Sequence, residues 1–104
     1  MMRGEVWWAS LPSPIGRRPV LILSRDSMPK GRTEITVVYL TTRVRHTLVE
    51  VPLTQTDGLP MTCVVNFDSI NTVPKRFLEA LICRLSEAKM AEVKSAILEA
   101  LDLT

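Results

Sequence analysis

The sequence predicts a small α+β domain in which five or six β-strands are closed by one C-terminal helix. Short runs rich in β-branched and aromatic residues recur between breaks that contain Pro or Gly, and the apolar period changes near residue 86. The chain has 104 residues, of which 46% are hydrophobic. A chain of this length supports one hydrophobic core, so we expect a single domain over residues 1–104.

The first two strands are predicted on either side of a turn. Residues 4–11 (GEVWWASL) are rich in residues that favour strands. Residues 12–16 (PSPIG) form the turn, because the two prolines restrict the backbone and the glycine permits a positive φ. Residues 19–24 (PVLILS) are almost wholly apolar, which is typical of a strand buried on both faces, and the proline suits its first position.

The middle of the chain alternates strands and breaks. A loop over residues 26–32, which contains Pro29 and Gly31, precedes residues 35–41 (ITVVYLT), where β-branched residues predict the clearest strand. The remaining predictions are strands at 48–53 and 62–67 around a turn at 57–60, a turn and short helical piece at 71–79, and a last strand at 80–85.

The last segment has the period of a helix. Ser86 is a good N-cap, and apolar residues follow at Met90, Val93, Ile97 and Leu101. Intervals of three and four residues place these side chains on one helical face. We therefore expect an amphipathic C-terminal helix that packs against the sheet.

Charge is distributed unevenly along the chain, although the net charge is only +2. Residues 1–46 hold eight basic and three acidic side chains, whereas residues 47–104 hold five basic and eight acidic ones. The positive potential in the N-terminal half favours an anionic partner.

Several classes of function lack the residues that they need. Cys63 and Cys83 stand in apolar settings outside any C-x-x-C motif, and His46 is the only histidine, so we expect neither a metal site nor a cofactor. There is no G-x-S-x-G or Walker motif. No signal peptide and no apolar run near the roughly 20 residues that span a bilayer are present, which predicts a reduced, cytoplasmic protein.

Arginines and hydroxyls at predicted strand ends are the remaining candidates for chemistry. An arginine presents a planar fork to phosphate oxygens and stays charged at any working pH, while a hydroxyl orients a phosphate oxygen or a ribose. RNA supplies its own nucleophile, the 2′-hydroxyl. Solvated loop charge and strand-edge propensity remain the alternative interpretation. The candidates are Arg17, Arg18, Ser24, Arg25, Thr41, Thr42, Arg43 and Arg45.

Two tryptophans add a further candidate contact. Because side chains alternate along a strand, Trp7 and Trp8 must point to opposite faces. One is expected in the core, and the other stacks on a base or covers a dimer interface.

Taken in order, these segments resemble the MazF/PemK family of toxin endoribonucleases over nearly the whole chain. The similarity begins at residues 3–7 (RGEVW) and continues through residues 18–24 (RPVLILS) and the strand 36–42 that ends in two threonines. Further matches are residues 51–53 with Gly58-Leu59, residues 63–65, residues 70–73 and residues 84–86.

The resemblance implies a small SH3-like β-barrel of the CcdB/MazF type that forms a homodimer. It also implies metal-independent cleavage of single-stranded RNA (mRNA, tRNA or rRNA) that leaves a 2′,3′-cyclic phosphate and a 5′-hydroxyl. A cognate antitoxin, typically with an acidic and partly disordered tail, would inhibit the toxin along its RNA-binding surface.

The resemblance also implies roles for single residues. The family's catalytic arginine falls on Arg18, which would stabilise the pentacoordinate phosphorane, and its catalytic threonine falls on Thr41, which would hold the scissile phosphate. Of the remaining RNA-binding candidates, Arg17, Arg43, Arg45 and His46 would line the phosphate path, and Ser69 or Asn71 would contact bases. The other candidates are Ser24, Arg25 and Thr42.

Two segments depart from the family pattern. The loop before Arg18 is shorter than usual and lacks an acidic residue, and residues 69–72 read SINT where a long amide and a cation are common. Both changes affect the recognised RNA sequence.

Two other functions remain open. One is a CcdB-like toxin that inhibits a protein target such as gyrase without catalysis, because a shared fold does not fix function. The other is a degenerate relative that only binds RNA.

Overall fold

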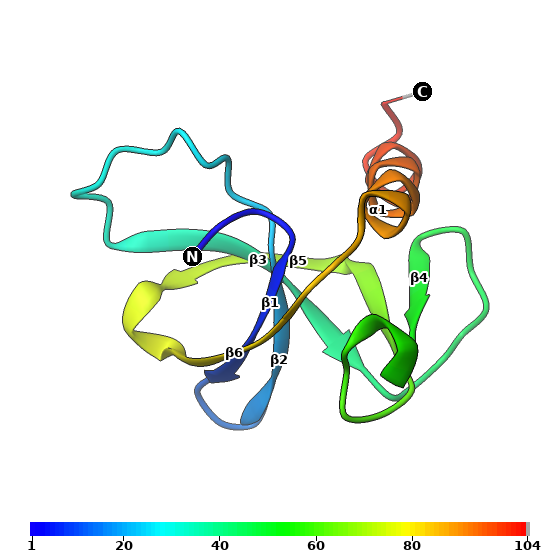
Figure 1. The fold of residues 1–104 in the computed structure, drawn as a ribbon, viewed down its shortest axis with the longest axis horizontal. Helices are drawn as coiled ribbons and strands as arrows, with labels where there is room; N and C mark the ends of the chain where they lie inside the picture. The colour runs from blue at the N-terminus through cyan, green and yellow to red at the C-terminus, as the bar shows by residue number, and fades with distance from the viewer. Residues whose placement is uncertain (104) are drawn as a thin grey trace.

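The computed structural model describes residues 1–103, which form a strongly curled antiparallel sheet followed by a C-terminal helix (Figure 1). The strand order is β4-β5-β3-β2-β1-β6, so that β4 and β6 are the edges of a half-barrel. This confirms the predicted α+β, barrel-like fold class. The elements of these residues are β1 (Glu5–Ser10), β2 (Arg17–Ile22), β3 (Glu34–Thr41), β4 (Glu50–Leu53), β5 (Cys63–Pro74), β6 (Leu78–Arg84) and α1 (Glu87–Ala100), with 3₁₀ turns at Gln55–Asp57 and Lys75–Phe77.

One strand is longer than the sequence predicts. β5 continues past Phe67 to Pro74, because its second half pairs with the beginning of β3 after a register shift. The prediction of a turn over residues 71–74 is therefore wrong, and the helical piece is confined to Lys75–Phe77. Exposed polar residues in this half of the strand, such as Asn71 and Thr72, hid the apolar alternation that marks a strand.

β2 begins two residues earlier than predicted, at Arg17, so that Pro19 is its third residue. Pro19 lies opposite Trp8 of β1, whereas the pairing with β3 begins only at Val20. A proline is tolerated here because the ladder with β3 starts after it. This extension makes the two arginines part of the strand, and alternation then sends them to opposite faces.

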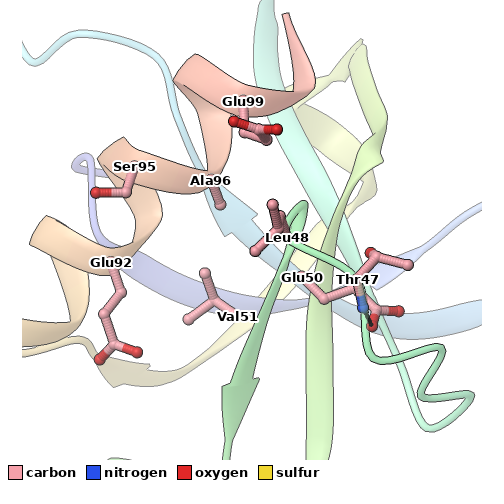
Figure 2. Close-up of a pocket in the computed structure, with 8 residues that line it drawn as sticks. All are labelled: Thr47, Leu48, Glu50, Val51, Glu92, Ser95, Ala96 and Glu99. Atoms are coloured by element: carbon pink, nitrogen blue, oxygen red, sulfur yellow. Dashed lines mark hydrogen bonds between the residues drawn. The ribbon is translucent and has the colours of Figure 1, made fainter. Parts of the chain in front are cut away.

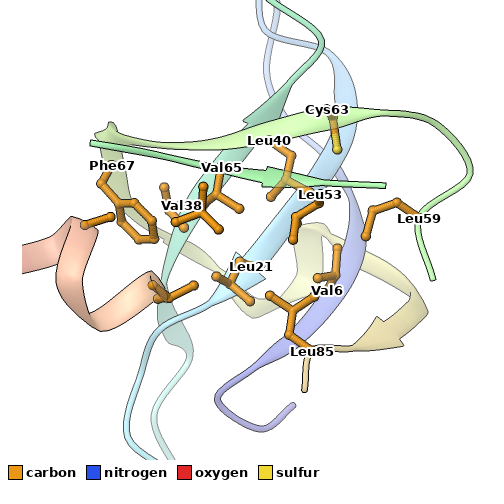
Figure 3. Close-up of a cluster of buried hydrophobic side chains, with 13 residues drawn as sticks. Val6, Leu21, Val38, Leu40, Leu53, Leu59, Cys63, Val65, Phe67 and Leu85 are labelled. Atoms are coloured by element: carbon orange, nitrogen blue, oxygen red, sulfur yellow. The ribbon is translucent and has the colours of Figure 1, made fainter. Parts of the chain in front are cut away.

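The sheet buries apolar side chains on both faces. The larger cluster lies between the sheet and α1 and includes Leu21, Val38, Leu40 and Phe67 (Figure 3). The other cluster contains Val20, Ile22, Ile35, Val37, Val73 and Leu78. β2 thus contributes to both clusters, which confirms the prediction of a strand buried on both faces.

The C-terminal helix confirms most of its predicted pattern. The Ser86 hydroxyl accepts a hydrogen bond from the backbone N–H of Lys89 (3.2 Å), and Val93 is buried against the sheet. Leu101 is an exception: the helix ends at Ala100, and Leu101 is 52% exposed. None of the helices within residues 1–103 is long and apolar enough to cross a membrane.

Candidate functional site

The pairing of β2 with β3 brings Arg18 and Thr41 to the same end of the sheet. Val20 lies opposite Tyr39 and Ile22 opposite Val37, so the same register continued by two residues places Arg18 opposite Thr41. Residues two apart on a strand share a face. Arg18 and Thr41 therefore continue the row of side chains that begins in the smaller apolar cluster and ends at the surface.

The Arg18 side chain is held in place but keeps unused donors. One terminal nitrogen donates to the carbonyl of Ile15 (3.3 Å), and the guanidinium carbon lies 6.0 Å from the centroid of the Tyr39 ring. Its Nε is buried without a hydrogen-bond partner in the described part of the chain, and none of the ion pairs within residues 1–103 includes Arg18. A buried donor left unpaired costs about 1–3 kcal/mol, and a bound water or ligand would remove that cost.

Thr41 carries its hydroxyl at the same end of the sheet as Arg18. The Thr41 Oγ1 accepts a hydrogen bond from the backbone N–H of Arg43 (3.2 Å), which leaves its own proton free to donate. Thr41 pairs with Val64 of β5, and Val64 pairs with Pro52 of β4. Next to these residues lies a groove of about 300 Å³, which Val44 and His46 also line. A mainly apolar groove with a few polar groups is typical of a ligand site.

Tyr39 and Asn71 complete the site. The Asn71 side-chain amide donates to the phenolic oxygen of Tyr39 (3.0 Å), so Asn71 is connected through the Tyr39 ring to Arg18. Tyr39 is not among the residues that the sequence singles out. The signal that identifies it is its position two residues before Thr41, which puts both on one face of the strand.

The loop between β3 and β4 is shaped by one carboxylate. Glu50 accepts hydrogen bonds from the backbone N–H groups of Arg45 (3.1 Å) and Thr47 (3.2 Å), and His46 between them has a positive φ of 57°. Because this loop starts at Thr41, it brings four of the predicted RNA-binding residues to the site, all of them exposed: Thr42, Arg43, Arg45 and His46.

Arg17 does not join this group. Its side chain lies over the Trp8 ring (4.2 Å to the centroid) and forms an ion pair with Glu79 (3.1 Å). Arg17 and Arg18 thus point to opposite faces of the strand, as the alternation requires.

The other predicted residues lie apart from Arg18. Ser24 accepts a hydrogen bond from the backbone N–H of Thr36 (2.8 Å), and Ser24 and Arg25 follow the far end of β2, about 20 Å from Arg18 by the rise of a strand. Ser69 lies in the part of β5 where the register with β3 shifts.

Charge distinguishes this end of the sheet from the hollow beside the helix. That hollow, about 370 Å³ in volume, lies between α1 and β4 (Figure 2). Glu92 and Glu99 line it together with Glu50, which also lines the groove near Thr41, so the hollow carries the greater negative charge and disfavours an anionic ligand.

The two thiols do not add a reactive group. Burial raises the pKa of Cys63 and of Cys83, which keeps both thiols protonated near neutral pH. In the part of the chain that the structure describes, no three His, Cys, Asp or Glu side chains gather as ligands of a metal ion would.

A half-buried arginine without an acidic partner among residues 1–103, on the same face as a threonine at the rim of a curled sheet, is suited to binding a phosphate ester. Known proteins show to which family the chain belongs. Residues 2–101 match the family described as the PemK-like, MazF-like toxin of type II toxin-antitoxin systems. The chain belongs to this family.

Individual relatives are similar over most of their length. The probable endoribonuclease MazF2 of Mycobacterium tuberculosis is 42% identical over 93 residues, which are 88% of this chain and 89% of the relative. Probable endoribonuclease MazF5 of the same species is 38% identical over 96% of this chain and 92% of its own. The solved structure of M. tuberculosis toxin MazF-mt6 superposes with a TM-score of 0.87 at 34% identity, covering 96% of this chain and 98% of its own.

Proposed function

We propose that the protein is the endoribonuclease toxin of a toxin-antitoxin system and cleaves single-stranded RNA in the cytoplasm, with residues 1–104 acting as one toxin domain. The observation that carries the proposal is the juxtaposition of Arg18, whose Nε is buried and unpaired, with Thr41 on the next strand. Family membership supports it, because curated relatives of the chain bear the name endoribonuclease.

The chemistry needs few protein groups because the RNA supplies the nucleophile. The 2′-oxygen attacks the adjacent phosphorus and loses its proton, the bond from phosphorus to the 5′-oxygen breaks, and the leaving oxygen takes up a proton. A 2′,3′-cyclic phosphate and a 5′-hydroxyl result. Negative charge builds on the phosphorane, so the fixed guanidinium of Arg18 stabilises the transition state, while the Thr41 hydroxyl donates to a phosphate oxygen. No metal ion is required by this scheme.

The surroundings of Thr41 fit a bound nucleotide. The groove walled by Val44, Pro52 and Val64 accepts a base or ribose beside the scissile phosphate. The exposed Arg43 and Arg45 reach flanking phosphates from the adjoining loop. Asn71, which lies on the Tyr39 side, contacts a base edge.

Two protein partners follow from the same proposal. The toxin forms a homodimer and is inhibited by a cognate antitoxin that covers the arginine-rich surface. A solved mycobacterial endoribonuclease in complex with its cognate antitoxin supports the antitoxin part of the proposal, with a TM-score of 0.87 at 29% identity over all of this chain and 97% of its own.

The test is cleavage of labelled single-stranded RNA in EDTA. We expect the wild type to release fragments with 2′,3′-cyclic phosphate ends, and we expect Arg18→Ala and Thr41→Ala to lose the activity while keeping the wild-type circular dichroism spectrum. Undiminished cleavage by Arg18→Ala would overturn the assignment of Arg18 to the catalytic site. If a broad pool of RNA stays intact, a CcdB-like inhibitor or an RNA-binding relative becomes the better explanation.

A further inference from the structure

Four basic side chains gather in a second hollow, away from Arg18 and Thr41. The loop before β3 supplies Lys30 and Arg32, and the 3₁₀ turn after β5 supplies Lys75 and Arg76. The hollow has a volume of about 390 Å³. The two segments are joined by a hydrogen bond from the backbone N–H of Lys75 to the carbonyl of Thr33 (2.8 Å), so the cluster has a defined backbone.

The charges of this basic hollow are not neutralised by neighbouring side chains. None of the ion pairs formed among residues 1–103 includes any of its four cations. Gly31, which also lines the hollow, has open space where a side chain would stand. Four like charges around an open depression repel one another, and a bound anion would relieve that repulsion.

The last residues of β5 lead from the candidate site to the basic hollow. Asn71 bonds to Tyr39, whose ring lies beside Arg18, and from Asn71 the strand β5 runs about 10 Å to Pro74, the residue before Lys75. Asn71 and Thr72 are exposed on opposite faces of the sheet, and Val73, which follows them, is buried. In Figure 1 the loop before β3 and the turn after β5 lie on the same side of the molecule.

We propose that the basic hollow binds backbone phosphates of the RNA several nucleotides away from the scissile bond, an inference that rests on the proposed function. An RNA strand is favoured as the occupant because it has evenly spaced phosphates, and the end of β5 joins the hollow to the strand that carries Asn71. Grooves that follow single-stranded nucleic acids span about 4–16 nucleotides. The hollow thus selects longer RNA without reading its sequence, since phosphate contacts carry no sequence information.

The test compares two charge-matched double variants on RNA of two lengths. One variant is Arg32→Gln with Lys75→Gln, which removes two charges from the hollow. The control is Arg84→Gln with Lys94→Gln, which removes two exposed charges from β6 and α1. Cleavage is measured with an RNA of about 5 nucleotides and with one of about 20, both containing the cleavage site.

We expect the hollow variant to raise KM for the long RNA roughly three- to tenfold, with kcat unchanged and the short RNA unaffected. The control should leave both substrates near wild-type values. Equal effects on the two lengths, no effect on the long RNA, or an equal loss in the control would each overturn the inference.

A binding measurement separates this inference from the proposed function. A fully 2′-O-methylated RNA of about 20 nucleotides cannot be cleaved, because it lacks the nucleophile. Its affinity should depend less steeply on salt in the hollow variant, by a slope of about 0.7 for each phosphate that the variant no longer neutralises. An unchanged salt slope overturns the inference that the hollow binds RNA phosphates, even if the wild type cleaves RNA. A lowered slope supports that inference, even if no cleavage is found.

Discussion

The two adjacent arginines of β2 allow a charge-matched test of the candidate site. Arg18→Gln and Arg17→Gln each remove one positive charge, and the two positions are neighbours in sequence. They differ in where the guanidinium lies. Arg18 shares a face with Thr41 and has an unpaired Nε within the described residues, whereas Arg17 is bound to Glu79 on the other face. Long-range electrostatics therefore change almost equally, and only the local contacts differ.

The structure gives a different magnitude for each variant. Loss of one donor that stabilises transition-state charge costs about 2.7–4 kcal/mol, so Arg18→Gln should lower kcat by roughly 100- to 1,000-fold. Arg17 forms an ion pair whose side chains are 55% and 46% exposed, and such a pair contributes about 0–1 kcal/mol to stability. We expect Arg17→Gln to lower activity less than about threefold and to lower the melting temperature by a few degrees.

The assay is single-turnover cleavage of a labelled RNA with enzyme in excess, together with thermal unfolding of each variant. Single-turnover rates separate the chemical step from product release. A loss of rate in Arg17→Gln as large as that in Arg18→Gln would refute the assignment, because it would show that net charge and not position controls the reaction. A single-turnover rate constant for Arg18→Gln within tenfold of the wild-type value would refute it as well.

Three further predictions concern a close contact, a positioning residue and a pH dependence. Gly58→Ala should lower the free energy of unfolding, measured in urea, by about 2–4 kcal/mol, because φ is +103° and the new Cβ would lie 2.7 Å from the Cβ of Cys83. The control Gly16→Ala, at φ +73° with no atom within 4 Å of the new Cβ, should lower it by about 1–2 kcal/mol. Equal losses in the two variants would contradict the role of the Cys83 contact. Tyr39→Leu should lower kcat more than Tyr39→Phe does, because Tyr39→Phe keeps the ring beside Arg18 and loses only the hydrogen bond from Asn71. In both variants KM should change less than kcat. Identical kcat values for the two variants would show that the ring does not position the guanidinium. The Glu5 pKa lies below its ordinary value of 4.5, chiefly because the backbone N–H of Met2 donates to its carboxylate. Ionised Glu5 therefore stabilises the fold above pH 4.5, and this contribution is lost as the pH falls through the lowered pKa. The difference in stability between wild type and Glu5→Gln should accordingly shrink between pH 7 and pH 3, and a constant difference would contradict the assignment.

Local signals are sufficient for most of the fold. The β-branched run of β3 and the N-cap at Ser86 depend on residues adjacent in sequence, and the structure confirms both. The end of α1 comes earlier than the apolar period predicts, since Leu101 fits the period but lies beyond the last turn of the helix. Periodicity indicates where a side chain would point, but it does not say where the backbone stops being helical.

Long-range pairing is not accessible to local reasoning. The second half of β5 is polar and exposed, and it is a strand because the beginning of β3 offers it hydrogen bonds. The same kind of pairing connects Tyr39 with Asn71 and sets Arg18 opposite Thr41. A strand's register depends on its partner, which no single segment encodes.

Ordered local motifs were enough to predict the fold class and the family resemblance, which in turn implied the two residues proposed for catalysis, because each of these signals lies within a short stretch of chain. Strand pairing in three dimensions was needed to show which of the adjacent arginines shares a face with Thr41. It also separated Ser24 and Arg25 from the site and brought two pairs of cations together, Lys30 and Arg32 with Lys75 and Arg76. The physical reason is that alternation and register act across strands, so that residues far apart in the chain become neighbours while adjacent ones turn to opposite faces.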